Sequence, residues 1–150
     1  MFKFIQLKAR IKKNEGYRNQ IYHDQLGKPT IGFGHLINKK EKFLHKKKYS
    51  KKYLNTVFEN DFNSALNNFN KSYKVKNLSK NLQEVLLEII FQLGINNFLK
   101  FKRFHKFLKK KYLHMAALEM LDSRWYIQTP KRVEKLVSSL LEYKNVKQRQ

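Results

Sequence analysis

Apolar residues recur at intervals of three and four along most of the chain, which is the spacing of one buried helix face. The first such run begins at Phe4 and should end near Gly16, because glycine is a poor helix interior residue and a good terminator. A long run follows Ser50, a good N-cap. A strongly apolar run then extends from Ser79 to Gly94 and predicts a buried central helix.

The second half of the chain continues the helical pattern. Phenylalanine occupies every third position from 98 to 107 with basic residues between, which predicts a helix over 98–111. Basic residues interleaved with aromatic ones also occur in proteins that bind single-stranded nucleic acid, but this spacing favours packing. A short helix is expected over 115–121, and a last helix should begin at Pro130 with Thr129 as its N-cap.

One short stretch alternates instead, as β-strands do. Residues 17–36 predict two or three antiparallel strands with a turn at 27–29. Residues 30–35 are expected to form the return strand, whose two glycines would let a ligand or another backbone come close. Glu15 at a helix end and Asp24 before the turn are two acids on different elements. The pattern predicts a mostly helical α+β protein with a small N-terminal antiparallel sheet.

The charge balance predicts attraction to polyanions. Lysine and arginine number 33 against 11 acidic residues, a formal charge of +22. Nucleic acid, anionic lipid and phosphate-bearing polymers of a bacterial surface would all be attracted. Many of the basic residues are lysines, and asparagines are frequent as well. An AT-rich genome also encodes these two residue types at surface positions that tolerate substitution. Selection for charge and codon composition both stay open.

Several classes of site are excluded by the sequence. The chain has no cysteine, so disulfides and thiolate chemistry are impossible. The five histidines show no paired metal spacing, Gly32-Phe33-Gly34 lacks the further glycine of a dinucleotide loop, and no nucleophile elbow occurs. We therefore expect no metal and no cofactor. The N-terminal residues lack the apolar core of a secretory signal, and no run has membrane-spanning length, so stable membrane insertion is not expected.

Three ordered blocks carry a family resemblance. The first block is residues 15–36, EGYRNQIYHDQLGKPTIGFGHL, in which eight residues separate Glu from Asp and five separate Asp from Thr. It resembles the catalytic segment of the phage-type lysozymes found in T-even bacteriophages. Two further blocks, IIFQLG at 89–94 and SRWYIQTPKR at 123–132, resemble that family in the same order. The resemblance spans nearly the whole chain. It is weak over 39–52, where this chain is shorter and more basic.

The resemblance implies a fold as well. It is a lysozyme-like α+β fold with two lobes, an N-terminal lobe with the sheet and a C-terminal helical lobe, joined by a long helix. In these terms the chain is a single domain over 1–150. One lobe would comprise about residues 12–55. The other would comprise about residues 1–11 together with 70–150, and the connecting helix would span about 51–70.

Roles for individual side chains follow from the same resemblance. Glu15 would be the general acid, Asp24 the carboxylate that stabilises positive charge and positions water, and Thr30 the hydroxyl that helps hold that water. The other implied positions are Leu36 and Phe91 at the sugar-binding cleft, Arg132 beside the glutamate, the structural pair His35 and Asp61, and a structural turn with Arg124, Trp125 and Gln128. Phe104 and Glu119 depart from the T-even type, where a hydroxyl and an amide contact substrate.

The resemblance implies a muramidase that hydrolyses the β-1,4 bond between N-acetylmuramic acid and N-acetylglucosamine in peptidoglycan and so lyses bacteria. Two alternatives stay open: a catalytically silent cationic relative that binds anionic wall, membrane or nucleic acid, and a lytic transglycosylase. The presence of both Asp24 and Thr30 argues against the second, because transglycosylases generally work with one acid. The expected protein is a monomer with no specific nucleic-acid partner. It would be held in the host cytoplasm until a holin-like membrane permeabiliser lets it reach the wall.

Overall fold

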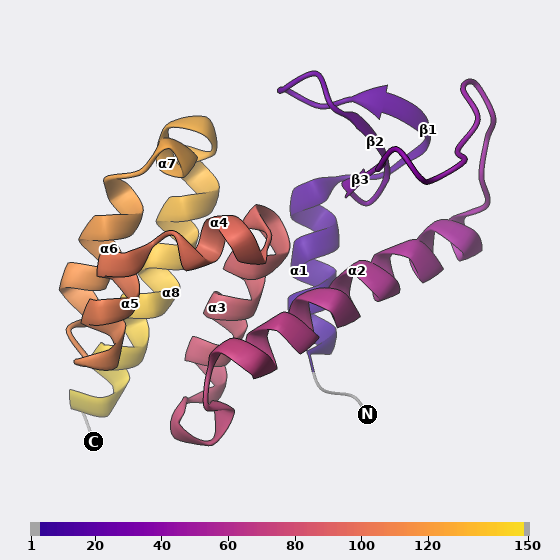
Figure 1. The fold of residues 1–150 in the computed structure, drawn as a ribbon. Helices are drawn as coiled ribbons and strands as arrows, with labels where there is room; N and C mark the ends of the chain where they lie inside the picture. Colours follow the sequence, from indigo (N-terminus) through magenta and orange to yellow (C-terminus); the bar gives the residue numbers. More distant parts are fainter. Residues whose placement is uncertain (1–3, 149–150) are drawn as a thin grey trace. The chain divides into compact units, whose positions relative to one another are not determined.

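The computed structural model describes the backbone of residues 4–148 and the side chains of residues 4–74 and 76–141 (Figure 1). Contacts group the chain into two compact units, Met1–Asn67 and Asn68–Gln150. The boundary falls inside one long helix, α2, which spans Lys51–Ser72. Residues 4–11 group with the sheet-bearing unit, and the lobe limits expected from the sequence stay a prediction.

The first unit contains one helix, a small sheet and most of α2. The sheet is antiparallel with the order β1-β2-β3, which confirms the strands predicted over 17–36 (Figure 1). The elements are α1 (Ile5–Glu15), β1 (Arg18–His23), β2 (Pro29–Gly32), β3 (His35–Leu36) and α2.

Helix α1 has the buried face and the end that the sequence predicts. Leu7 and Ile11 are buried completely. The helix stops after Glu15 because Gly16 takes a positive φ of 73°, which costs a residue without a Cβ little. The amide of Gly16 still donates to the carbonyl of Lys12 at 3.0 Å, so the last turn is closed. The sequence thereby places Glu15 at a fixed helix end.

The return strand is shorter than predicted. Strand β2 ends at Gly32, and Phe33 and Gly34 form a turn before β3 begins, so the expectation of one strand over 30–35 is wrong in its second half. The cause is the backbone of the two glycines. Gly32 has φ 65° and Gly34 has φ 76°, values that an extended strand does not contain.

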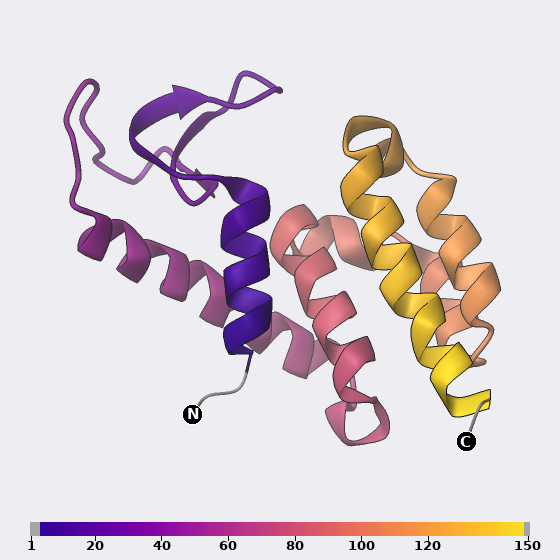
Figure 2. The same cartoon turned by 180° about the vertical axis from the view of Figure 1, so that it is seen from behind.

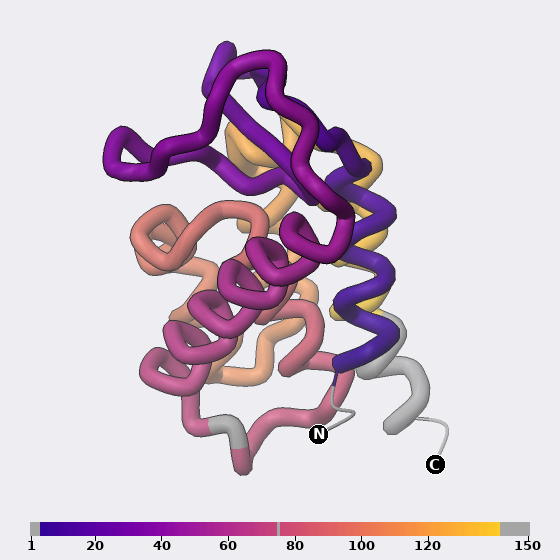
Figure 3. The backbone as a smooth tube through the Cα atoms, turned by 90° about the vertical axis from the view of Figure 1, so that its right-hand side faces the viewer, coloured from indigo at the N-terminus to yellow at the C-terminus, as the bar shows by residue number. Residues whose placement is uncertain are grey.

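Helix α2 begins as predicted, after a loop that leads from the sheet (Figure 3). The hydroxyl of Ser50 accepts a hydrogen bond from the amide of Tyr53 at 3.2 Å, which satisfies one of the free donors at the helix start. The core of this unit is aromatic. Phe33 on the turn meets Phe58 on α2 edge to face, with ring centroids 5.8 Å apart. The glycine turn is therefore anchored to the helix.

The second unit is entirely helical within its described residues. Helices α6 and α8 lie side by side in it (Figures 1 and 2). The elements after α2 are η1 (Val75–Asn77), α3 (Lys80–Leu93), α4 (Ile95–Leu99), α5 (Lys102–Lys109), α6 (Leu113–Leu121), α7 (Arg124–Gln128) and α8 (Pro130–Gln148). Helix α3 is capped by Ser79, ends at Gly94 and buries six consecutive residues, which confirms the central helix.

The helix predicted over 98–111 is divided. Helix α4 ends at Leu99, and α5 begins at Lys102 after Phe101, whose ψ of 59° is not helical. A strict three-residue repeat drifts by about 60° per step around an α-helix, so one straight helix cannot bury all four rings. The break lets Phe98 and Phe104 both reach the core, at 0% and 2% exposure. Packing, the favoured interpretation of these phenylalanines, is confirmed for this pair.

Helix α8 begins at Pro130 as predicted, and the N-cap role of Thr129 stays a prediction. Its hydroxyl donates to the carbonyl of Trp125 at 3.2 Å and accepts from the side-chain Nε2 of Gln92 at 3.2 Å. The residue therefore closes α7 and ties it to α3. Trp125 itself is buried at 5% exposure, as suits a residue of a structural turn.

Candidate active site

Glu15 is the last residue of α1, and its side chain is half-buried against the glycine turn of the sheet. A Cβ built on Gly34 would lie 2.6 Å from Oε2 of Glu15, 3.0 Å from Cδ and 3.2 Å from Cβ. The 2.6 Å separation is too short for a non-bonded carbon and oxygen, and the other two are tight. The missing side chain at Gly34 therefore leaves the space that the Glu15 side chain occupies. The sequence showed a glycine suited to close approach, but not what it approaches.

Asp24 is fixed by the hairpin turn that follows β1. Its Oδ1 accepts hydrogen bonds from the amides of Leu26 and Lys28, each at 2.9 Å. Its own amide donates to the carbonyl of Lys28 at 3.0 Å, and its carbonyl accepts from Gly27 at 2.9 Å. Because both side-chain bonds engage one oxygen, Oδ2 is the oxygen left to meet water or a ligand. The turn thus orients the carboxylate without neutralising it.

Thr30 follows in β2, and its side chain is buried at 2% exposure. Its hydroxyl donates to the carbonyl of Lys28 at 3.0 Å. Thr30 also pairs with Tyr22 across the hairpin. With its proton engaged by a backbone carbonyl, the hydroxyl oxygen has only lone pairs to offer, so it can accept a hydrogen bond from a water.

Tyr22 links the two acids electrostatically. Burial and then the charge of Glu15 raise the pKa of its hydroxyl, Arg18 lowers it, and Asp24 raises it again. The guanidinium of Arg18 lies over the ring, 4.8 Å from its centroid. Tyr22 therefore lies within the field of both carboxylates and presents a neutral hydroxyl at neutral pH. Sequence reasoning treated it only as a strand residue, although its position two before Asp24 was the available signal.

His35 joins the sheet to α2 through two carboxylates. Its Nδ1 lies 2.8 Å from Oδ2 of Asp61, and its Nε2 lies 2.8 Å from Oε1 of Glu41. Since both ring nitrogens face carboxylate oxygens, the arrangement suits a doubly protonated imidazolium. The hydrogen bond that His35 donates to Asp61 raises the pKa of His35 most, burial opposes the rise, and the Asp61 charge and Glu41 add to it. Sequence reasoning paired His35 with Asp61 but missed Glu41.

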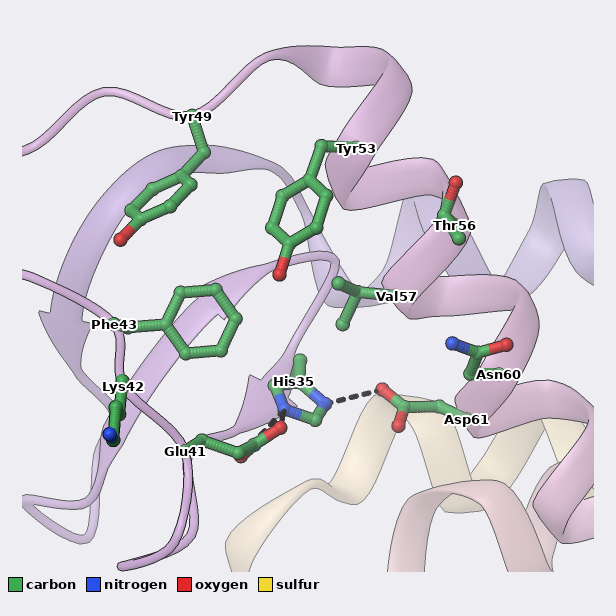
Figure 4. A pocket seen from close by; sticks show the side chains of 10 residues that line it. All are labelled: His35, Glu41, Lys42, Phe43, Tyr49, Tyr53, Thr56, Val57, Asn60 and Asp61. Atoms are coloured by element: carbon green, nitrogen blue, oxygen red, sulfur yellow. Dashed lines mark hydrogen bonds and ion pairs between the residues drawn. The ribbon is translucent and has the colours of Figure 1, made fainter.

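A pocket of about 430 Å³ lies beside this histidine. Figure 4 shows His35 between Glu41 and Asp61, with three aromatic rings around the remaining space. The rings belong to Phe43, Tyr49 and Tyr53. Glu15, Asp24 and Thr30 do not line this pocket. It is therefore a feature of the loop before α2, separate from the paired acids.

The remaining candidate residues are divided between the units. Leu36 is on β3 in the first unit and is 51% exposed. Phe91 on α3 and Arg132 on α8 belong to the second unit, and both are half-buried. The sugar-binding cleft and the placement of Arg132 beside Glu15 therefore stay predictions. Arg124 and Gln128 are the first and last residues of α7.

Phe104 and Glu119, the two residues that depart from the T-even type, both contact other residues of the second unit. Phe104 is a core residue at 2% exposure. Glu119 forms an ion pair with Arg103, whose Nε lies 3.1 Å from Oε1. The same unit buries one carboxylate that sequence reasoning missed, Glu88 on α3, at 1% exposure.

Within the described part of the chain, no group of three or more His, Asp or Glu side chains is placed to hold a metal ion. Among the same residues, no helix combines the length and the apolar character needed to cross a bilayer.

The fold and the paired acids define a lysozyme-like α+β protein. The model of the family described as phage lysozyme matches residues 12–140, and the chain belongs to this family. Two relatives are from Dictyostelium discoideum. "Probable T4-type lysozyme 2" is 32% identical over 92% of this chain and 98% of its own length. "Probable T4-type lysozyme 1" is 31% identical over 88% and 91% respectively. Membership supports a lysozyme-like glycosidase function.

Stability should depend on pH through His35. An unfolded histidine titrates near 6.5, and the folded pKa is raised, so the stabilisation is fully present below about pH 6.5 and is lost as pH rises through the folded pKa. We expect the melting temperature of the wild type to fall between about pH 6 and 9, and that of His35→Gln to be lower and flatter. His45→Gln, at an exposed loop position, is the matched control. Parallel pH profiles for wild type and His35→Gln would contradict the assignment.

Proposed function

We propose that this protein is a muramidase that hydrolyses the β-1,4 bond between N-acetylmuramic acid and N-acetylglucosamine in peptidoglycan. The observation that carries the proposal is that both acids lie at turns of the same three-stranded sheet. Glu15 lies against Gly34 in the turn after β2, and Asp24 is held in the turn before β2. Two carboxylates in different surroundings are what glycoside hydrolysis requires. Membership of the phage lysozyme family supports the same reaction class.

In this mechanism Glu15 protonates the leaving oxygen of the glycosidic bond while positive charge develops at the anomeric carbon. Asp24, oriented through Oδ1 by two amides, stabilises that charge and positions a water through Oδ2. Thr30 supports the water as a hydrogen-bond acceptor, because its own proton is donated to Lys28. The water attacks the anomeric carbon from the face opposite the leaving group and passes its proton to Asp24. Inversion at the anomeric carbon follows, with the carboxyl groups roughly 6.5–9.5 Å apart.

The test is analysis of the soluble products that the wild type releases from purified peptidoglycan. Mass spectrometry should find muropeptides with a free reducing end, and NMR of the first product should find the α anomer, inverted from the β bond. A β product would overturn the single-displacement mechanism and leave a hydrolase. Anhydro-sugar products would identify a lytic transglycosylase instead.

A second candidate function is a catalytically silent relative that binds anionic surfaces. The formal charge of +22 is the observation that favours it. Absence of any soluble product from peptidoglycan, together with salt-sensitive binding to the same material, would establish this alternative. The setting of bacterial lysis, the need for a separate membrane permeabiliser and the monomeric state stay predictions.

A further inference from the structure

A second pocket, of about 510 Å³, opens on the second unit along α5. Three lysines of α5 and the lysine that follows the helix line the pocket. Tyr73 and His105 also contribute to the lining. We call the four lysines the α5 lysine face: Lys102, Lys106, Lys109 and Lys110. All four are exposed. Lysines at 102, 106 and 109 recur at four and three residues, so they form a row roughly 10 Å long.

The positive charge of the α5 lysine face is not balanced nearby. Residues 62–83 and 89–118, the two stretches that contribute to the pocket, contain no aspartate or glutamate. Arg103 on the same helix forms an ion pair with Glu119, but among the described residues none of the four lysines pairs with a carboxylate. A concave surface of one sign concentrates field and favours an anionic ligand.

The opposite side of α5 is used for packing. Phe104 and Leu108 are buried, at 2% and 7% exposure, where α5 meets α6. The helix therefore presents a cationic face without the apolar face that insertion into a lipid surface requires. Its phenylalanines also leave few exposed rings on which unpaired bases could stack. Both observations favour a polyanion that carries phosphate groups but neither acyl chains nor bases.

The pocket lining includes a neutral hydrogen-bonded pair, Tyr73 and His105, beside the exposed Leu99. Nε2 of His105 donates to the carbonyl of Phe98 at 2.7 Å, and the hydroxyl of Tyr73 donates to Nδ1 of the same ring. Burial and the charge of Lys109 lower the pKa of His105, and its bond to Phe98 partly opposes the shift. The histidine is thus held as a neutral ring whose titration reports on the charge of Lys109.

We propose that the α5 lysine face binds a phosphodiester polymer of the kind that carries alditol units, with poly(glycerol phosphate) as the simplest example. Lysines recognise phosphate as point charges and do not need a planar partner. The site would hold the protein on an anionic wall independently of cleavage. It adds a binding function to the proposed hydrolysis and does not depend on it.

The test compares two variants of equal charge in binding to soluble poly(glycerol phosphate). The first replaces the whole α5 lysine face with glutamine, and the second replaces four exposed lysines of the loop and the start of α2: Lys39, Lys40, Lys48 and Lys52. Each variant changes the formal charge from +22 to +18, since four positive charges are removed. We expect the α5 variant to lose about tenfold or more in affinity and to have a shallower salt dependence, and the loop variant to change by about twofold at most.

Equal losses in the two variants would overturn the proposal, because attraction would then come from diffuse charge. Tighter binding of a single-stranded oligonucleotide with the same number of phosphates, lost in the α5 variant, would assign the face to nucleic acid instead. Tighter binding of anionic phospholipid vesicles than of poly(glycerol phosphate), lost in the α5 variant, would assign the face to membranes. Melting temperatures within a few degrees of the wild type would show that both variants fold.

A second readout places the polymer at the pocket. NMR titration should show the pKa of His105 rising when poly(glycerol phosphate) binds, because phosphate neutralises the field of Lys109. The rise should disappear in the α5 variant and persist in the loop variant. If the wild type is saturated with polymer and the pKa of His105 stays unchanged, the polymer does not bind at this site. Hydrolysis of polymer-free peptidoglycan, measured in parallel, separates failure of the binding site from failure of the proposed enzyme.

Discussion

Replacement of Glu15 by glutamine is expected to lower the release of muropeptides from peptidoglycan by about 10²–10⁴-fold. The amide keeps the size of the side chain, so its fit against Gly34 is preserved, but it has no proton to give to the leaving oxygen. The measurement is the initial rate of soluble product formation, with binding to the same peptidoglycan determined in parallel. Binding should be retained, since the amide keeps the size and the hydrogen-bonding capacity of the side chain.

Glu59→Gln is the matched control for this prediction. Glu59 lies on α2 in the same unit and forms an ion pair with Lys8, with Nζ and Oε2 2.6 Å apart. That pair is partly exposed, so its loss should cost no more than about 1 kcal/mol of stability. We expect Glu59→Gln to hydrolyse peptidoglycan at nearly the wild-type rate. Comparable activity in Glu15→Gln and Glu59→Gln would remove Glu15 from the mechanism.

The positions of the two acids followed from local rules that the sequence displays. Helix periodicity and Gly16 define where α1 ends, so Glu15 could be placed at a helix terminus. Strand alternation and the residues before Pro29 define the hairpin that holds Asp24. Both features depend on neighbours within a few residues. Local sequence therefore sufficed for the elements that carry the acids.

Contacts that depend on the path of a loop were not available from local patterns. Glu41 reaches His35 because the chain after β3 folds back, and its Oε2 also accepts from the amide of Asn38 at 2.8 Å. The approach of Gly34 to Glu15 needs the turn at Phe33, which packs against Phe58. These contacts are set by packing between elements, whereas periodicity describes only one element at a time.

The division of the helix over 98–111 shows a different limit. The spacing of the phenylalanines indicated burial correctly for Phe98 and Phe104. It could not show that burying both requires non-helical backbone at Phe101. A repeat of three is close enough to the helical period to predict a helix, and different enough to predict strain in a long one. Two of the lysines between the rings, Lys102 and Lys106, line the pocket on which the proposed binding site rests.

Gly34→Ala is expected to lower peptidoglycan hydrolysis by about a hundredfold or more while the protein stays folded. The new methyl group would meet Oε2, Cδ and Cβ of Glu15 at 2.6–3.2 Å. The contact with Cβ can relax by a few tenths of an ångström, but the 2.6 Å contact with Oε2 forces the carboxylate to rotate away from its place. A displacement of about 1 Å at a reacting group can cost about 10²-fold in rate.

Gly94→Ala separates this effect from backbone strain. Gly94 has the same φ of 76° as Gly34, but a Cβ built on it has no atom within 4 Å. Both alanines bear the cost of a positive φ, on the order of 1–3 kcal/mol, so the melting temperature should fall in both variants. Only Gly34→Ala should lose activity beyond the fraction unfolded, because only it moves Glu15. Equal activity in the two variants would mean that catalysis tolerates a displaced glutamate, and the close approach of Gly34 would then be structural alone.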